Sequence, residues 1–154
     1  LWGLSGGKWF RLKEYYYASK ETGQQRTDEE HYAALEKLCL GVNPDFIIVD
    51  PSAASFMECI RRHGKFKVKA ADNNVLNGIR RVANALSEGK IFFSPSCVSA
   101  IKEFYLYCWD EKSGGDTPLK TNDHAMDDIR YFVNAVIKNS GGDDGFFVAS
   151  LSRN

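Results

Sequence analysis

The sequence lacks the features that mark several specialised classes of protein. No apolar run approaches the roughly 20 residues that a membrane-spanning helix needs. The first residues contain no cationic segment followed by an apolar one, so we expect no signal peptide there. Neither a CxxC pair nor a cluster of histidines occurs, which excludes zinc-finger spacing and a dense disulfide framework. We therefore expect free, buried thiols at the four cysteines, Cys39, Cys59, Cys97 and Cys108.

The chain also lacks net charge, because twenty basic residues balance twenty acidic ones. A neutral protein can still bind phosphate through a local basic patch, so this balance neither indicates nor excludes a nucleic-acid partner. Of the 154 residues, 44% are hydrophobic and 26% are charged, which is typical of a globular domain with its own core. The chain has no initiator methionine and opens on apolar residues, so we expect it to be a piece of a longer protein.

Hydrophobic periodicity predicts a β-rich start followed by alternating helices and strands. We expect a hairpin formed by residues 1–4 and 8–17. Further strands are predicted at 46–49, 65–70, 91–93 and 146–149, and helices near 27–42, 53–62, 75–88, 98–108 and 122–136. This order predicts an α/β fold in which helices flank a mixed β-sheet. We expect one domain at 1–139 and a Gly-rich C-terminal tail at 140–154.

Asp50 ends the apolar run Phe46–Val49 and is followed by Pro51. Ligands of open α/β sheets bind outside the carboxyl ends of the strands. A carboxylate in that place is held by a rigid element, which suits a metal site. Asp50 can equally cap the next helix or close a turn with Ser52. Both interpretations stay open on this residue alone.

The segment TNDHAMDDIRYFV places three aspartates and a histidine at the start of an apolar helix. Asn122 and Asp123 are both good N-caps, and of the two we expect Asp123 to cap this helix. Asp127 and Asp128 follow His124 at i+3 and i+4, which places the three side chains on neighbouring parts of one helix surface. A carboxylate beside the core-facing stripe is costly unless a cation compensates it. A divalent metal and Arg130 are both candidates for that cation.

Five blocks of the sequence resemble the C-terminal nuclease domain of phage large terminases, the DNA-packaging motor proteins. In order they are LKEYYY, IIVDPSAASF, KAADNNVLNGIRRV, EFYLYCWDEK and NDHAMDDIRYFV, and the resemblance covers residues 1–138. It implies a ribonuclease H-like fold and a metal-dependent endonuclease that cuts concatemeric double-stranded viral DNA during packaging. It also implies the terminase small subunit and the portal protein as partners, in the host cell cytoplasm.

The resemblance implies a catalytic cluster of three acids, of which two have matches in this chain. The strand acid matches Asp50 and the acid on the last helix matches Asp127. His124 is a further catalytic candidate, and Asp123 and Asp128 are further candidate metal ligands. The acid of the family's first strand has no counterpart, because the chain opens at what resembles the second strand. No GxxxxGK(S/T) motif replaces the absent ATPase half.

The chemistry implied by the resemblance is two-metal phosphodiester hydrolysis. Two Mg²⁺ or Mn²⁺ ions about 4 Å apart can activate a water and stabilise the leaving oxygen. Carboxylate oxygens suit both metals, whereas the lack of Cys/His clusters argues against structural zinc.

Basic residues around the acids would bind DNA phosphates without sequence preference. The candidates are Arg61, Arg62, Lys69, Arg80 and Arg81. Asn73, Asn74 and Asn77 can contact the DNA backbone or cap the helix that follows them, and Glu14 can be an outer acid of the site. Two other functions stay open. One is a docking module without catalysis that contacts the portal or the small subunit, and the other is a different ribonuclease H-like nuclease, such as a junction resolvase.

Overall fold

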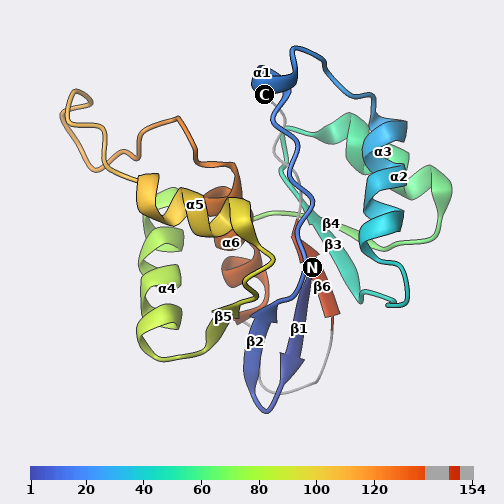
Figure 1. Cartoon of the computed structure of the whole chain (residues 1–154), viewed down its shortest axis with the longest axis horizontal. Coiled ribbons are helices and arrows are strands. Elements are labelled where there is room, and N and C mark those ends of the chain that lie inside the picture. Colours follow the sequence, from blue (N-terminus) through green and yellow to red (C-terminus); the bar gives the residue numbers. More distant parts are fainter. Residues whose placement is uncertain (138–145, 150–154) are drawn as a thin grey trace.

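The computed structural model describes residues 1–137 and 146–149. A six-stranded sheet runs through the molecule in the order β4-β3-β6-β1-β2-β5 (Figure 1). Its strands are β1 (Trp2–Ser5), β2 (Lys8–Arg11), β3 (Phe46–Val49), β4 (Val68–Ala70), β5 (Ile91–Phe93) and β6 (Phe146–Ala149). The helices are α1 (Ser19–Thr22), α2 (Asp28–Leu38), α3 (Ala54–His63), α4 (Val75–Ser87), α5 (Val98–Leu106) and α6 (His124–Ala135).

The sheet is mixed, as predicted, because a hairpin and crossover connections contribute strands of both directions. β1 and β2 pair antiparallel around Gly6 and Gly7, whose positive φ angles suit a tight turn. β2 pairs in parallel with β5, and β3 pairs in parallel with β4. The predicted strand at 146–149 is confirmed as β6, which lies between β1 and β3. A strand from the segment predicted to be a tail therefore occupies the middle of the sheet.

Alternation along β3 divides the core between the two faces of the sheet. Ile48 packs with buried residues of α4, α5 and α6, whereas Ile47 and Val49 pack with buried residues of α2 and α3. Successive side chains of a strand point to opposite faces, so two helices cover one face and three cover the other (Figure 1). Within the described residues, no helix is both long and apolar enough to span a bilayer.

The ends of some elements differ from the prediction. The second hairpin strand ends at Arg11 and does not reach Tyr17. The reason is that the chain beyond Arg11 leaves the sheet and bonds to α5, through Glu14 at the start of that helix and through Tyr16 to Glu103. The strand predicted from residue 65 begins at Val68, and the short helix α1 was not predicted.

Candidate active site

Asp50 directly follows β3 and lies at the carboxyl end of that strand, with 9% of its surface exposed. One carboxylate oxygen accepts the Ser52 amide hydrogen at 2.8 Å, so the predicted turn with Ser52 is confirmed. The other oxygen accepts a hydrogen bond from the hydroxyl of Tyr131 on α6. Asp50 therefore both closes a turn and faces the last helix across the end of the sheet.

Asp127 is linked to Asp50 through three other side chains. Arg130 Nη2 donates to Asp127 Oδ1 at 2.7 Å. Both terminal nitrogens of Arg130 donate to Asn73 Oδ1, at 3.3 and 3.4 Å. The Tyr131 hydroxyl, whose proton bonds to Asp50, also lies 3.4 Å from Asn73 Oδ1. These five residues, which we call the Asp50 cluster, connect the end of β3, the loop before α4, and α6.

The surroundings of Asp50 favour its ionised form. Burial by itself would raise the pKa of the Asp50 carboxyl. The hydrogen bonds from Tyr131 and Ser52 outweigh this effect, with help from the positive charge of Arg130, so the pKa of Asp50 lies below its usual value. Burial, followed by the bond to Asp50, raises the pKa of Tyr131, so its hydroxyl stays protonated and keeps donating.

Asp127 has further polar neighbours that are not part of the Asp50 cluster. Its Oδ2 lies 4.0 Å from Lys120 Nζ. Burial, followed by the negative charge of Asp127, raises the pKa of Tyr107 to about 12. Tyr107 directly follows the last residue of α5. The carboxylate of Asp127 is thus only 13% exposed and lies between two cations and a protonated phenol.

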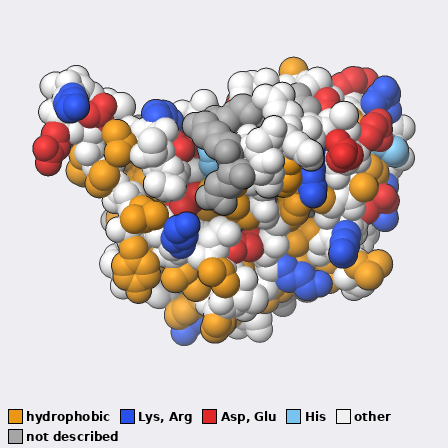
Figure 2. Space-filling view, turned by 45° about the horizontal axis from the view of Figure 1, so that its top comes forward, with side chains coloured by type: hydrophobic (Ala, Val, Ile, Leu, Met, Phe, Trp, Pro, Cys, Tyr) orange, Lys and Arg blue, Asp and Glu red, His pale blue; other side chains and the backbone are white. Residues whose placement is uncertain are grey.

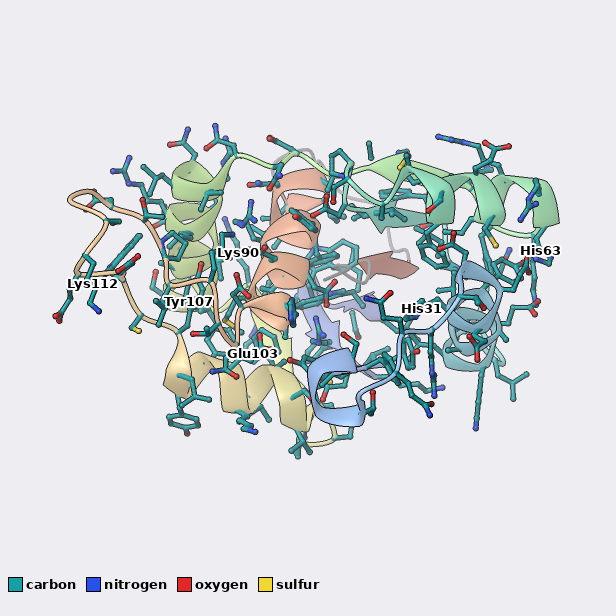
Figure 3. All side chains as sticks on the ribbon, turned by 90° about the horizontal axis from the view of Figure 1, so that it is seen from above. His31, His63, Lys90, Glu103, Tyr107 and Lys112 are labelled. Atoms are coloured by element: carbon teal, nitrogen blue, oxygen red, sulfur yellow. The ribbon has the colours of Figure 1, made fainter. Side chains whose placement is uncertain are left out.

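Asp123 occupies the N-cap position of α6, but the prediction that it caps this helix is wrong. Its backbone is αR, with φ −118° and ψ −2°, and its side chain makes no capping bond. A cap needs an extended backbone to turn the side chain back onto the first turn. Glu103 of α5 takes that role, because its Oε2 accepts the amide hydrogens of Ala125 at 2.7 Å and Met126 at 3.2 Å (Figure 3). The carboxylate of Asp123 lies 3.9 Å from His124 Nδ1.

Glu14 makes the corresponding contact with α5, which also begins without a side-chain cap of its own. Its two carboxylate oxygens accept the amide hydrogens of Ser99 at 2.6 Å and Ala100 at 3.1 Å. Arg11 Nη2 lies 3.7 Å from the same carboxylate. The structure therefore places Glu14 at a helix start, where a negative charge is favoured.

Asp128 points into the core and pairs with Arg11 of β2. Burial raises the pKa of the Asp128 carboxyl, and the charge of Arg11 acts in the opposite direction. The structure does not bring Asp128 into the Asp50 cluster, and its role as a ligand stays a prediction.

His124 has 30% of its side chain exposed, and its ring centroid lies 6.3 Å from that of Tyr16. Its catalytic role also stays a prediction.

The predicted DNA contacts lie on three separate elements. They are Arg61 and Arg62 in the last turn of α3, Lys69 on β4, and Arg80 and Arg81 on α4. Arg81 donates to Asn134 of α6 at 2.9 Å, and Lys69 Nζ lies 3.7 Å from the centroid of the Phe46 ring. On the face drawn in Figure 2, basic side chains are interspersed with acidic ones. The role of these five residues in DNA binding stays a prediction.

Tyr131 was not predicted as part of a site, although the sequence holds a signal for it. It follows Asp127 by four residues, so both side chains lie on the same side of α6. Asn73 was predicted only as a cap or a DNA contact. Asn74 is the residue that caps α4, by accepting the Asn77 amide hydrogen at 3.3 Å, which leaves Asn73 for the Asp50 cluster.

Comparison with known proteins supplies a family and several relatives. The family described as "Terminase RNaseH-like domain" matches residues 11–136. The large terminase subunit of Escherichia phage T5 is 28% identical over 134 residues, which are 83% of this chain and 29% of that protein.

Solved structures of the large terminase from a thermophilic bacteriophage share the fold. The ADP complex in crystal form 3 has a TM-score of 0.83 and 42% identity, covering 88% of this chain and 35% of that one. The structure in crystal form 2 has a TM-score of 0.84 and 43% identity over the same shares. The chain thus spans about a third of the length of the relatives that it matches.

Proposed function

The chain belongs to the terminase RNaseH-like domain family, and we propose that it is the nuclease domain of a viral large terminase. The resemblance found in the five sequence blocks and the ribonuclease H-like fold are both confirmed. The proposed activity is metal-dependent endonucleolytic cleavage of concatemeric double-stranded DNA during packaging in the host cell cytoplasm. By the same family relation, we propose the terminase small subunit and the portal protein as partners.

The observation that carries this proposal is the Asp50 cluster. Asp50 and Asp127 are 77 positions apart in the sequence and lie on different elements, yet they share one hydrogen-bonded network. The network lies outside the carboxyl end of a buried strand, where open α/β sheets bind their ligands. Carboxylates held together in this way suit metal-assisted hydrolysis of an anionic substrate.

The residues of the Asp50 cluster fit a hard divalent cation such as Mg²⁺ or Mn²⁺. Asp50, Asp127 and Asn73 all offer oxygen atoms, which these ions prefer. Arg130, which is 2% exposed, already supplies positive charge between Asp127 and Asn73. We propose Asp50 and Asp127 as the ligands of this cation. The pair of ions implied by the family resemblance stays a prediction.

A bound divalent cation supplies an activated water and a counter-charge for the leaving oxygen. The chain's own residues orient the ligands. Tyr131 and the Ser52 amide each bind one oxygen of Asp50, which fixes the plane of its carboxylate. Arg130 offsets part of the negative charge of the two aspartates, so the cluster repels a DNA phosphate less strongly.

Nicking of supercoiled plasmid tests the proposal. We expect relaxed and linear products with Mn²⁺ or Mg²⁺ and none with EDTA, from this chain or from the longer protein expected to contain it. Loss of a residue that merely supports a metal ligand typically costs 10–100-fold, so Asp50→Asn and Asp127→Asn should each slow cleavage about 100-fold or more. Asp116→Asn, in an exposed loop, is the matched control and should cut at the wild-type rate.

Three outcomes would count against the proposal in different ways. Wild-type rates for both Asp50→Asn and Asp127→Asn would show that these residues are not the ligands. Binding of portal protein without any cleavage, in either length of protein, would favour a docking module. A strong preference for branched over linear DNA would favour a junction resolvase.

A further inference from the structure

A second polar cluster lies between α2 and α3, on the other face of the sheet from α6. Glu29, Cys59 and His63 form it, and their ligand atoms all lie within 4.8 Å of one another. His63 Nε2 is 2.7 Å from Glu29 Oε2, and Cys59 Sγ is 3.5 Å from Glu29 Oε1. Within the described part of the chain, no other group of three or more His, Cys, Asp or Glu side chains has its ligand atoms this close together.

Each of the three side chains is held by a separate feature of the fold. Cys59 and His63 are i, i+4 neighbours on α3, so they lie on the same side of that helix. Cys59 is buried in the core between the helices and the sheet. The His63 ring stacks on the ring of Tyr32, with a centroid distance of 3.8 Å and an interplanar angle of 8°. Glu29 is in the first turn of α2, which packs against α3.

We propose that Glu29, Cys59 and His63 form a Zn²⁺ site that links α2 to α3. Structural zinc was not expected from the sequence, because these three ligands come from two helices and form no cluster in the sequence. A thiolate, an imidazole and a carboxylate are ligand types that zinc accepts, and three protein ligands leave the fourth tetrahedral position for water. Thiolate and imidazole together select zinc-like metals over Mg²⁺, which takes oxygen ligands. Figure 3 shows His63 at the outer end of α3, far from α6, so this site is separate from the Asp50 cluster.

The distances between the ligand atoms fit the proposal. With Zn–N and Zn–O near 2.0 Å and Zn–S near 2.3 Å, the ligand atoms of a tetrahedral site are roughly 3.3–3.5 Å apart. The 3.5 Å between Cys59 Sγ and Glu29 Oε1 already has this value, whereas His63 Nε2 lies against the other carboxylate oxygen, Oε2. The 2.7 Å between His63 and Glu29 is a direct hydrogen bond, and binding requires it to open by only about half an ångström.

Arg62 opposes metal binding at this site. Its Nη2 donates to Glu29 Oε1 at 3.0 Å, so a cation already shares the carboxylate that zinc would use. Both side chains of this pair are more than half exposed, and exposed pairs of this kind are weak. We therefore expect Arg62→Gln to tighten zinc binding by about two- to fivefold.

Titration with Co²⁺, a spectroscopic substitute for Zn²⁺, tests the site, because cobalt bound to a thiolate gives an intense near-ultraviolet charge-transfer band. We expect this band in the wild type and expect added Zn²⁺ to displace it. Cys59→Ser and His63→Gln should lose the band. The matched controls are Cys39→Ser, another buried cysteine, and His31→Gln, and both should keep it.

The proposal of a zinc site is wrong if the wild type gives no thiolate–cobalt band, or if the band survives both Cys59→Ser and His63→Gln. If Cys59→Ser does not fold, His63→Gln and Glu29→Gln carry the test, because both alter exposed side chains. A second measurement is thermal unfolding: Zn²⁺ should raise the Tm of the wild type and leave that of His63→Gln unchanged. Asp50→Asn should keep both responses, which separates this result from failure of the proposed nuclease.

Discussion

Asp127 and Asp128 are neighbours on α6, and each pairs with an arginine. Their side chains are almost equally exposed, at 13% and 12%. Asp127 pairs with Arg130 of its own helix, which also binds Asn73 in the Asp50 cluster. Asp128 pairs with Arg11 of β2 and so ties the helix to the sheet.

The exposed fraction of the side chain therefore does not distinguish the two aspartates, whereas the arginine with which each one pairs does. Successive residues of an α-helix differ by about 100° in direction, so neighbours meet different surroundings. One pair is part of a network at the end of a strand, and the other is an internal link between two elements. We expect changes at Asp128 to act on stability and changes around Asp127 to act mainly on cleavage.

The largest effect on stability is expected for Asp128→Asn. It removes the nearer of the two carboxylates beside Arg11, whose side chain is 5% exposed, and leaves only that of Glu14, 3.7 Å away. Breaking a buried pair in this way costs about 3–5 kcal/mol of unfolding free energy. Asp127→Asn should cost less, about 1–2 kcal/mol, because Arg130 keeps Asn73 as an acceptor. Urea unfolding followed by circular dichroism measures both, and equal losses would remove the distinction between the two pairs.

Gly78→Ala tests how closely Arg130 is packed. A Cβ at Gly78 of α4 would lie 2.4 Å from Arg130 Cγ and 2.6 Å from Arg130 Cδ. Overpacking of this kind costs about 1–3 kcal/mol, which exceeds the helix propensity gain of about 1 kcal/mol from glycine to alanine. We expect a net loss of up to about 2 kcal/mol, together with slower cleavage, because Arg130 must move relative to Asp127. Urea unfolding measures the first effect and plasmid nicking the second.

Asn84→Ala, on the exposed part of the same helix, is the control for Gly78→Ala. It should gain a few tenths of a kcal/mol from helix propensity alone, about the usual difference between these residues. A gain of similar size in Gly78→Ala would show that Arg130 is free to move aside and that its position is not set by α4.

The smallest loss of stability is expected for Tyr131→Phe, which removes the hydroxyl that donates to Asp50. One such hydrogen bond contributes about 1 kcal/mol. Because the bond lowers the pKa of Asp50 in the folded protein, its contribution is complete above the unfolded value of about 4 and is lost as the pH falls through the lower folded pKa. The difference from wild type should therefore be largest at neutral pH and shrink in acid.

The urea unfolding midpoints of wild type and Tyr131→Phe at pH 7 and pH 3 show whether the stability difference shrinks in acid. Tyr105→Phe, at a side chain that is 86% exposed, is the control and should match the wild type at both values. A stability difference for Tyr131→Phe that is unchanged at pH 3 would show that the hydroxyl acts through packing and not through the charge of Asp50.

Local signals in the sequence predicted those elements whose ends are set by near neighbours. The Thr27–Glu30 capping box is present with both of its bonds, and α2 begins where it indicates. Asn74 caps α4, and β3 occupies the apolar run before Asp50. These features depend on residues within one turn or one strand, so the sequence pattern contains all the necessary information.

The predictions of helix caps failed where a residue distant in the sequence makes the capping hydrogen bonds that a local residue was expected to make. Asp123 had the right residue type and position for a cap, yet Glu103 caps α6 from 22 residues away. Glu14 caps α5 from 85 residues away. No local sequence pattern indicates such caps, because they depend on how α5 packs against the chain that follows the hairpin.

Periodicity was sufficient for the mixed sheet and for most of its helices, and the family resemblance marked Asp50 and Asp127, whose role as metal ligands stays a prediction. They were not sufficient to show which acids share a network, because Asp128 and Arg11 are 117 residues apart and Asp50 and Tyr131 are 81 apart. The same holds for Cys59 and Glu29, 30 residues apart, which sequence spacing could not place together. A sequence pattern gives the direction of a side chain around its own helix, whereas its partner depends on the packing of segments that are remote in the chain.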